Sequence, residues 1–502
     1  MNAPLLERYA DRIAGVLTCY DRIVITGTLP GACHAAGMTS FLNAHHIRIF
    51  DYPRFAEPLR DRIRANAEKL ATSAGTKIEY IAKAHVRKES IVAAVIQERG
   101  DHPGLVHVIS TMEACSSYRS WHDKRTHETF LRPTPGKCLH YYFYFIDPKL
   151  GLVYLRVPTW CPFRLQFYCN GHGWLARQLA AANIDYTMAD NAFIRIDDWD
   201  RAQQLADRLS PDVLHRVLDH YAKQCCPVLD VFGQTYHWSL MQIECSTDLA
   251  FRSEATMLPL YQAISREAIV SVKAEHVMHF LGKKMSPQLM QEVESRLSTR
   301  IEGTCIKHRL GKNSVKMYDK FGRVLRIETT TNDVSFFKHH RKVEHRDGHA
   351  SRELAAVKKS IYSLIDLRET LLGCNRRYLE FLSALDDFSA GTRSLDKLTT
   401  AKQIDGHRVK GFNFFDKTEH SLLCSLQRPE FNISGVRRAD LKPYLPHLSA
   451  SSITRYLKRL RDFGLIKKVV GTYRYYLTRI GRNAIAAACK LSEHVIIPAL
   501  AV

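Results

Sequence analysis

The chain has 502 residues, of which 45% are hydrophobic and 25% are charged, a composition typical of folded proteins. This length is too great for one core and predicts about three domains. There are 72 lysines and arginines against 51 aspartates and glutamates, a formal net charge of +21. Residues 401–502 hold about half of this surplus, with 18 basic against 7 acidic residues. Such a surplus points to a polyanionic partner.

Several classes of protein are disfavoured. No apolar stretch reaches the length of about 18 residues that a membrane span needs, so no membrane partner is expected. Residues 1–12 contain Glu7 and Asp11, which is unlike a signal peptide. The 13 cysteines include no Cys-x-x-Cys pair, which argues against a zinc ribbon, and no organic cofactor is indicated. These features predict a cytoplasmic protein, and they leave its oligomeric state open.

Residues 1–112 alternate between helical and strand patterns, which predicts an α/β layer whose role the sequence does not reveal. The predicted helices are 5–17, 55–74 and 87–99. The predicted strands are 22–28, 77–82 and 105–110.

Residues 113–350 predict a central α+β region with antiparallel hairpins. The polar stretch 113–135 is predicted to be a long loop, and the aromatic hairpin 138–157 follows it. Further predicted strands are 238–247, 304–308, 314–318 and 324–329. Further predicted helices are 174–182, 196–224 and 254–299. Residues 351–411 predict a long helix over 352–387 and a linker.

Residues 412–502 carry the pattern of a winged helix, in which a recognition helix precedes a two-stranded wing. Ser449 is a suitable N-cap for a helix over 450–463, and residues 465–477 predict the wing. The apolar face of the helix is Ile453, Tyr456, Leu457 and Leu460. The segment 416–490 resembles winged-helix regulators such as the MarR family, which implies a DNA-binding module.

The opposite face of this helix and the wing are basic, and they form the predicted contact with DNA. The first residues of the helix would meet base edges in the major groove, and the later cations would meet phosphates. Winged helices also dock onto proteins, which is the alternative role for this module. The predicted DNA-binding residues are Ser451, Ser452, Arg455, Lys458, Arg459, Arg461, Lys467, Lys468, Arg474 and Arg479.

The central region carries three short motifs, which are Trp238 on an acidic strand, YDK at 318–320 and RIE at 326–328. They resemble motifs of the rolling-circle replication initiators of plasmids and filamentous phages, and the loop at 170–172 falls where those proteins have a Gly-Asn motif. The resemblance implies strand nicking. A tyrosine attacks a backbone phosphorus, and a divalent cation, Mg²⁺ or Mn²⁺, polarises the phosphoryl oxygen.

Within this resemblance, Tyr318 is the predicted nucleophile and Lys320 the predicted phosphate-binding residue. The family usually carries a His-hydrophobic-His pair, which this sequence lacks, and His140 is among the nearest substitutes. The predicted metal ligands are Glu244, Asp248, Glu328 and His140. The alternative is a plain β-hairpin with a cross-strand Lys–Glu pair.

The sequence therefore predicts a multidomain α+β protein that binds nucleic acid, most simply duplex DNA. Its predicted parts are 1–112, 113–350, 351–411 and 412–502. As an enzyme, it would be a metal-dependent strand nickase of a replication initiator or mobile element. Two alternatives stay open: a non-enzymatic, MarR-like transcriptional regulator, and an RNA-binding ribonucleoprotein component in which the aromatic residues of 141–144 stack on bases.

Overall fold

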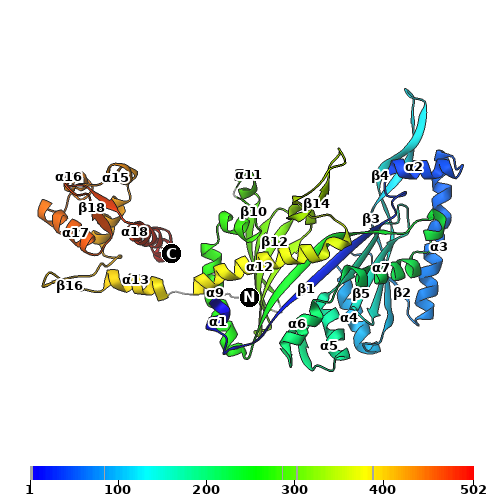
Figure 1. Cartoon of the computed structure of the whole chain (residues 1–502), viewed down its shortest axis with the longest axis horizontal. Helices are drawn as coiled ribbons and strands as arrows, with labels where there is room; N and C mark the ends of the chain where they lie inside the picture. The colour runs from blue at the N-terminus through cyan, green and yellow to red at the C-terminus, as the bar shows by residue number, and fades with distance from the viewer. Residues whose placement is uncertain (1–3, 84, 285, 301–302, 387–388, 502) are drawn as a thin grey trace. The chain divides into compact units, whose positions relative to one another are not determined.

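The computed structural model describes every residue except 1–3, 84, 285, 301–302, 387–388 and 502. The chain forms two compact units, Met1–Asp386 and Asp387–Val502 (Figure 1). Both units contain helices and strands, so the α+β class is confirmed. None of the described helices is both long enough and apolar enough to cross a membrane.

The first unit is built on an 11-stranded sheet with β1 (Ile13–Thr28) and β9 (His237–Phe251) paired antiparallel at its centre. Outward from β1 lie β6 (Leu165–Cys169), β5 (Gly151–Pro158), β4 (Glu128–Asp147), β3 (Gly104–Asp123) and β2 (Ile78–Tyr80). Outward from β9 lie β13 (Val324–Thr331), β12 (Asn313–Lys320), β11 (Gly303–Leu310) and β10 (Val293–Arg300). Strands from 1–112 and from 113–350 therefore share one sheet, and these two stretches are not separate domains.

The two halves of the sheet repeat one topology, although the sequence shows no repeat. In each half a long central strand leads to helices, then to a meander of four antiparallel strands that returns to pair with the long strand. The helices of the first half are α2 (Ala35–Ala44), α3 (Tyr52–Ser73) and α4 (Lys88–Arg99). Those of the second half are α9 (Glu254–Ser271), α10 (Ala274–Phe280) and α11 (Pro287–Met290).

Two amphipathic helices, α7 (Pro211–Cys225) and α12 (Leu364–Asp386), lie along one face of the sheet (Figure 1). Leu218 and Leu371 from these helices join Ile23 and Ile25 of β1 in one buried cluster. The alternate side chains of the strands therefore point to the opposite face. The remaining elements around the sheet are α1 (Pro4–Arg8), α5 (Gly171–Ala181), β7 (Tyr186–Ala189), β8 (Ala192–Ile196), α6 (Trp199–Ala206), α8 (Leu229–Phe232), β14 (Lys338–Glu344) and β15 (Ala350–Ala356).

Several predictions of secondary structure are wrong. The helix predicted over 352–387 begins only at Leu364, because residues 350–356 form β15, and the helix predicted over 196–224 is divided into α6 and α7. The helix predicted over 5–17 ends at Arg8, because β1 begins at Ile13 and its first residues pair with the last residues of β9. The loop predicted over 113–135 is a continuation of the β3–β4 hairpin, which protrudes from the sheet in Figure 1. It is polar because part of it lies outside the core. The last residues of the helix predicted over 254–299 form β10.

In the second unit the helix and the two short strands predicted over 450–477 are present, whereas the predicted linker before residue 412 contains a helix and two strands. The helix predicted over 450–463 is α17 (Ala450–Asp462), and the Ser449 hydroxyl caps it by accepting from the Ser452 backbone N–H at 3.1 Å. Ile453, Leu457 and Leu460 are buried, as their spacing predicts. The other elements are α13 (Ser389–Thr399), β16 (Lys402–Ile404), β17 (His407–Val409), α14 (Lys417–Leu426), α15 (Pro429–Ser434), α16 (Arg438–Leu441), β18 (Ile466–Lys468), β19 (Tyr475–Leu477), α18 (Arg479–Leu491) and α19 (Ile497–Leu500).

The close approach of α5 to β1 yields a test of the fold. A Cβ atom on Gly171 would lie 2.4 Å from the backbone oxygen of Tyr20. We expect Gly171→Ala to destabilise the protein by about 1–3 kcal/mol, because backbone cannot move aside as a side chain can. Gly136→Ala is the control, since its Cβ would meet nothing closer than 3.9 Å. Thermal unfolding followed by circular dichroism should show a lower Tm for Gly171→Ala alone, and equal shifts would contradict this packing.

Candidate functional site

A β-bulge in β1 positions the first residue of the candidate site. Tyr20 pairs with Cys245 and Arg22 pairs with Glu244, so Asp21 has no partner on β9. A bulge of this kind re-aims the extra side chain and bends the strand. Asp21 and the adjacent Arg22 consequently both line one cavity on the face opposite α7 and α12.

Three buried carboxylates converge at this cavity, whose volume is about 230 Å³. They belong to Asp21 on β1, Glu244 on β9 and Glu328 on β13, and one oxygen from each lies within 4.8 Å of the other two. Their strands are neighbours at the centre of the sheet, and alternation directs Glu244 and Glu328 to the same side. Carboxylate oxygens at this separation are suitable ligands for Mg²⁺ or Mn²⁺.

A hydrogen-bonded row crosses the same cavity. The Tyr318 hydroxyl donates to one oxygen of Glu328, and the Lys316 ammonium donates to the other. Lys316 also lies 3.7 Å from Glu244, and it faces Glu328 directly across the β12–β13 ladder. The cross-strand Lys–Glu pair that the sequence allowed is therefore present, and it lies beside the carboxylate cluster.

Burial and charge shift the protonation of this row. Burial, followed by repulsion from Glu244 and Asp21, outweighs the attraction of Lys316 and raises the pKa of Glu328 to about 8. Burial and the adjacent Glu328 also raise the pKa of Tyr318 well above its ordinary value, so the phenol is protonated at neutral pH. A neutral donor thus faces an acceptor whose pKa lies near neutrality, a pairing suited to proton transfer.

A second network supports the site from one side. Arg326 is fully buried and donates to both carboxylate oxygens of Asp248, each at 2.6 Å. His172 on α5 contacts Asp248 at 3.5 Å and Asp21 at 3.3 Å. Asn191 donates to Asp21 at 2.6 Å. Although burial opposes it, Arg326 holds the pKa of Asp21 well below its ordinary value, so this carboxylate is charged.

The structure brings together only some of the predicted site residues. Tyr318, Glu244 and Glu328 meet in the cavity, and Lys320 lines it while donating to Asn191 at 2.8 Å. Asp248 is held by Arg326 instead of facing the cluster, so it is not a member of the ligand set. The resemblance associated Asp248 with the strand of Trp238, which extends beyond its predicted end at residue 247, and the cross-strand register pairs Asp248 with Arg326.

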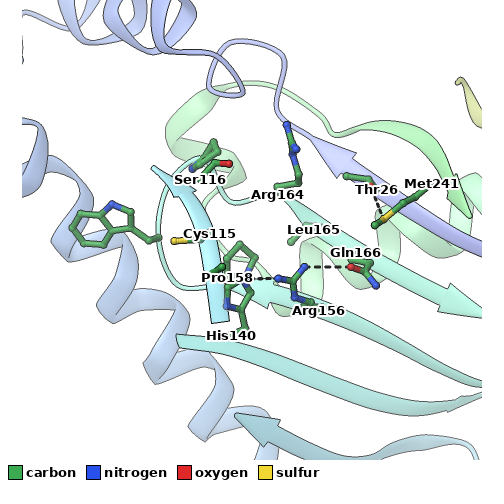
Figure 2. A pocket seen from close by; sticks show the side chains of 13 residues that line it. Thr26, Cys115, Ser116, His140, Arg156, Pro158, Arg164, Leu165, Gln166 and Met241 are labelled. Atoms are coloured by element: carbon green, nitrogen blue, oxygen red, sulfur yellow. Dashed lines mark hydrogen bonds between the residues drawn. The ribbon is translucent and has the colours of Figure 1, made fainter. Parts of the chain in front are cut away.

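His140 belongs to a different cavity, of about 370 Å³ (Figure 2). Arg156 donates to His140 at 3.1 Å and to Gln166 at 3.2 Å. Figure 2 shows these two contacts on opposite sides of Arg156. Burial and the neighbouring Arg156 lower the pKa of His140 to about 4, so the imidazole is neutral. The prediction of His140 as a metal ligand beside Glu244 is wrong, because the chain order of the motifs does not report distance across the sheet.

A row of aromatic and basic side chains lies on the same sheet face, from β1 to β5. The Arg22 guanidinium lies over the Tyr168 ring at 5.3 Å, and the rings of Tyr168 and Tyr154 stack at 5.2 Å. Gln166 donates to the Tyr154 hydroxyl at 3.2 Å and accepts from Arg156.

By contrast, Tyr141, Tyr142, Phe143 and Tyr144 are buried in the cores, so these residues do not form the base-stacking surface of the RNA alternative.

In the second unit, most of the predicted DNA-binding side chains are accessible, but two are committed to the fold. Arg459 donates to Glu419 at 2.7 Å and to the backbone oxygen of Lys410 at 2.8 Å, and it lies over the Phe412 ring. Arg474 donates to the backbone oxygen of Ser434. Exposed members of the predicted set are Ser451, Arg455, Lys458, Arg461, Lys467, Lys468 and Arg479, and Ser452 is half-buried.

Asp21 and Lys316 line the cavity but were not predicted as site residues. Asp21 stands within a strand that was expected to begin at residue 22, and only the bulge directs it to the cluster. The sequence left open which basic residue pairs with Glu328. The alternation that places Glu328 on this face places Lys316 there too, since the two residues pair directly.

No family model matches this chain, and no curated protein matches it. Among solved structures, it aligns with a class II 3-hydroxy-3-methylglutaryl-CoA reductase from Streptococcus pneumoniae, bound to NADPH in open conformations. The alignment has 9% sequence identity, covers 89% of this chain and 78% of that chain, and has a TM-score of 0.14. That TM-score is too low to indicate a common fold, and the reductase carries no weight for the function of this chain.

The raised pKa of Glu328 predicts a pH dependence of stability. Between its ordinary pKa of 4.5 and its folded pKa of about 8, the folded protein keeps a proton that the unfolded chain has lost. This group therefore makes the free energy of unfolding fall as pH rises through that window. We expect Glu328→Gln to remove this contribution, so that the Tm of the variant relative to wild type increases from pH 5 to about pH 8.

Glu113→Gln is the matched control, because burial is outweighed by Lys88, Tyr142 and Arg156, and the pKa of Glu113 is lowered. Its Tm difference from wild type should stay constant above pH 5, where Glu113 is charged in both states. A pH-independent difference for Glu328→Gln would mean that Glu328 is already ionised in the folded protein.

Proposed function

We propose that this chain is a DNA-binding protein whose first unit nicks one strand with Tyr318 as nucleophile, in the manner of a replication initiator or a mobile-element nickase. The observation that carries the proposal is the row Tyr318–Glu328–Lys316 beside Asp21 and Glu244. An activated nucleophile is characterised by a base within hydrogen-bond reach and a third group that orients the base. Glu328 is the base within hydrogen-bond reach of Tyr318, and Lys316 is the group that orients Glu328.

The proposed step is an in-line displacement at phosphorus. The Tyr318 oxygen forms a bond to phosphorus while Glu328, in its ionised form, accepts the phenol proton. With a pKa of about 8, Glu328 is ionised in a fraction of the molecules at neutral pH and in most of them above pH 8. The bond from phosphorus to the 3′ oxygen breaks, and that oxygen leaves with a proton from solvent. The product is a 5′-phosphotyrosine, and Lys320 at the edge of the cavity is placed to hold the phosphate.

The residues present fit a divalent cation. Asp21, Glu244 and Glu328 offer hard oxygen donors, and their mutual repulsion would be relieved by a cation. Mg²⁺ or Mn²⁺ would supply Lewis-acid polarisation of the phosphoryl oxygen there. Lys316 neutralises part of the same charge, so a bound cation has to displace it from Glu328.

We propose further that the second unit is a winged helix of MarR type that binds duplex DNA. Its support is the order α16, α17, β18 and β19, in which a helix with one basic face is followed by a two-stranded antiparallel segment. The tip of this segment presents Val470 and Tyr473, which are 96% and 82% exposed. The proposed cellular location is the cytoplasm.

A nicking assay tests the catalytic part. With supercoiled plasmid and Mn²⁺, the full chain should form a covalent protein–DNA adduct, and Tyr318→Phe should abolish it without weakening DNA binding, because only the nucleophilic oxygen is lost. Glu328→Gln should slow nicking by about 10²–10⁴-fold, the usual contribution of a general base. Mn²⁺ should raise the Tm of wild type and leave that of Glu328→Gln unchanged.

Tyr80→Phe is the matched control, since this tyrosine is 56% exposed and lies on β2 at the sheet edge. It should form adducts at the wild-type level. Adducts that persist in Tyr318→Phe would move the nucleophile to another residue. DNA binding with neither nicking nor a Tm response to Mn²⁺ would favour a non-enzymatic regulator, and preference for RNA would favour the ribonucleoprotein alternative.

The basic face of α17 is tested separately. Replacing Arg455 and Lys458 with alanine should weaken DNA binding and lower the salt slope, the dependence of log K on log salt concentration, by roughly two units. Fluorescence anisotropy at several KCl concentrations measures this slope. Arg459→Ala should mainly lower the Tm, because Arg459 bonds Glu419 and backbone oxygens. An unchanged slope in the double variant would place the DNA elsewhere on the protein.

A further inference from the structure

Two helices of the second unit bring together four side chains that ligate metals. On α14, His420 and Cys424 are four residues apart and share one face of the helix. Cys489 lies near the end of α18, and Glu493 follows it by four residues, in the helical turn Ser492–Ile496. The two helices are in contact. The nucleic-acid function proposed above assigns no role to any of these residues.

The distances among the four groups are short. The Cys424 Sγ lies 2.8 Å from the Cys489 Sγ, 3.7 Å from the His420 Nδ1 and 3.7 Å from the Glu493 Oε1. One donor atom each from His420, Cys424 and Cys489 lies within 4.8 Å of the other two. Tetrahedral zinc with bonds of about 2.0–2.3 Å holds its donors at about 3.3–3.8 Å from one another. The His420 and Glu493 atoms are already at that range from the Cys424 sulfur, and the two sulfur atoms have to separate by about 1 Å to reach it.

The chemistry of the four groups favours zinc over a simple disulfide. A disulfide would account for the proximity of Cys424 and Cys489, but not for the His420 imidazole and the Glu493 carboxylate, which each lie 3.7 Å from the Cys424 sulfur. Two thiolates, one imidazole and one carboxylate are all ordinary zinc ligands, and four of them complete a closed structural site. Cys489 is buried, whereas His420 and Cys424 are half-buried and Glu493 is exposed, which leaves a path for the ion.

We propose that His420, Cys424, Cys489 and Glu493 form a structural zinc site that ties α14 to α18. These helices pack in the same core as α17, which contributes Leu457 and Leu460. Zinc binding would therefore contribute directly to the free energy of folding of this unit. The sequence has no Cys-x-x-Cys pattern that would reveal this zinc site. Its ligands instead form two pairs, His-x-x-x-Cys and Cys-x-x-x-Glu, and the two cysteines are 65 residues apart.

The test is the metal content of the full chain, purified under reducing conditions without chelator. Elemental analysis should find about one zinc per chain in wild type. Co²⁺ added to the metal-free protein should produce thiolate charge-transfer and tetrahedral d–d absorption bands. Cys489→Ser should lose stoichiometric zinc and the charge-transfer intensity of one thiolate. Cys374→Ser is the control, because Cys374 is also buried but lies in the first unit, and it should keep both signals.

Two further measurements keep the result decisive if Cys489→Ser folds poorly. His420→Ala removes a half-buried ligand and should likewise lose zinc, and a chelator should lower the Tm of wild type but not of His420→Ala. Absence of zinc and of Co²⁺ bands in well-folded wild type would overturn the proposal. So would a mass lower by two hydrogens, mapped by peptide analysis to a Cys424–Cys489 disulfide in reducing buffer.

Discussion

The antiparallel pairing of β1 with β9 is the constraint on which the first unit depends. It joins two halves of like topology into one sheet, and its register decides which side chains meet at the centre. The bulge at Asp21 interrupts this pairing at one position and turns a carboxylate toward Glu244 on the partner strand. Because side chains alternate along each strand, a shift of one residue in this register would send Glu244 to the helix-covered face and dissolve the cluster.

Burying so many charges in the centre of a sheet requires compensation, and the structure supplies it with two cations of different kinds. Arg326 forms a bidentate pair with Asp248, which is the geometry that best offsets the desolvation of both groups. Lys316 offsets Glu328 with a flexible stem that can move away. The first pair is therefore suited to holding the site in place, and the second to yielding when a cation or phosphate arrives. This contrast between a fixed and a displaceable cation supports the proposed chemistry at Glu328.

The sequence predicted those site residues whose positions depend on neighbours in the chain, and it did not predict those whose positions depend on distant strands. Tyr318 and Glu328 were singled out because their motifs resemble those of replication initiators, and the regular alternation of their strands lets both reach the cavity. The Ser449 cap and the buried face of α17 follow from short-range rules. Asp21 was not predicted, because a bulge is a property of two strands distant in sequence. Arg459 was taken for a DNA contact because its helix face looks polar, and its true partner, Glu419, lies 40 residues earlier. The prediction of His140 as a metal ligand is wrong for the same kind of reason, because the sequence does not show how far apart two residues lie across the sheet.

The two halves of the sheet share a topology but present different chemistry on the face opposite α7 and α12. Beside β9 this face carries carboxylates and lysine, and beside β1 it carries the stacked rings of Tyr154 and Tyr168 capped by Arg22. Reaction at a phosphate needs charge that is fixed and desolvated, whereas binding of neighbouring nucleotides needs flat and cationic surfaces that tolerate sequence. Under the proposed function, the duplicated arrangement divides these two demands between its halves. Arg22 stands at their boundary, because it lines the carboxylate cavity and also lies over the first aromatic ring.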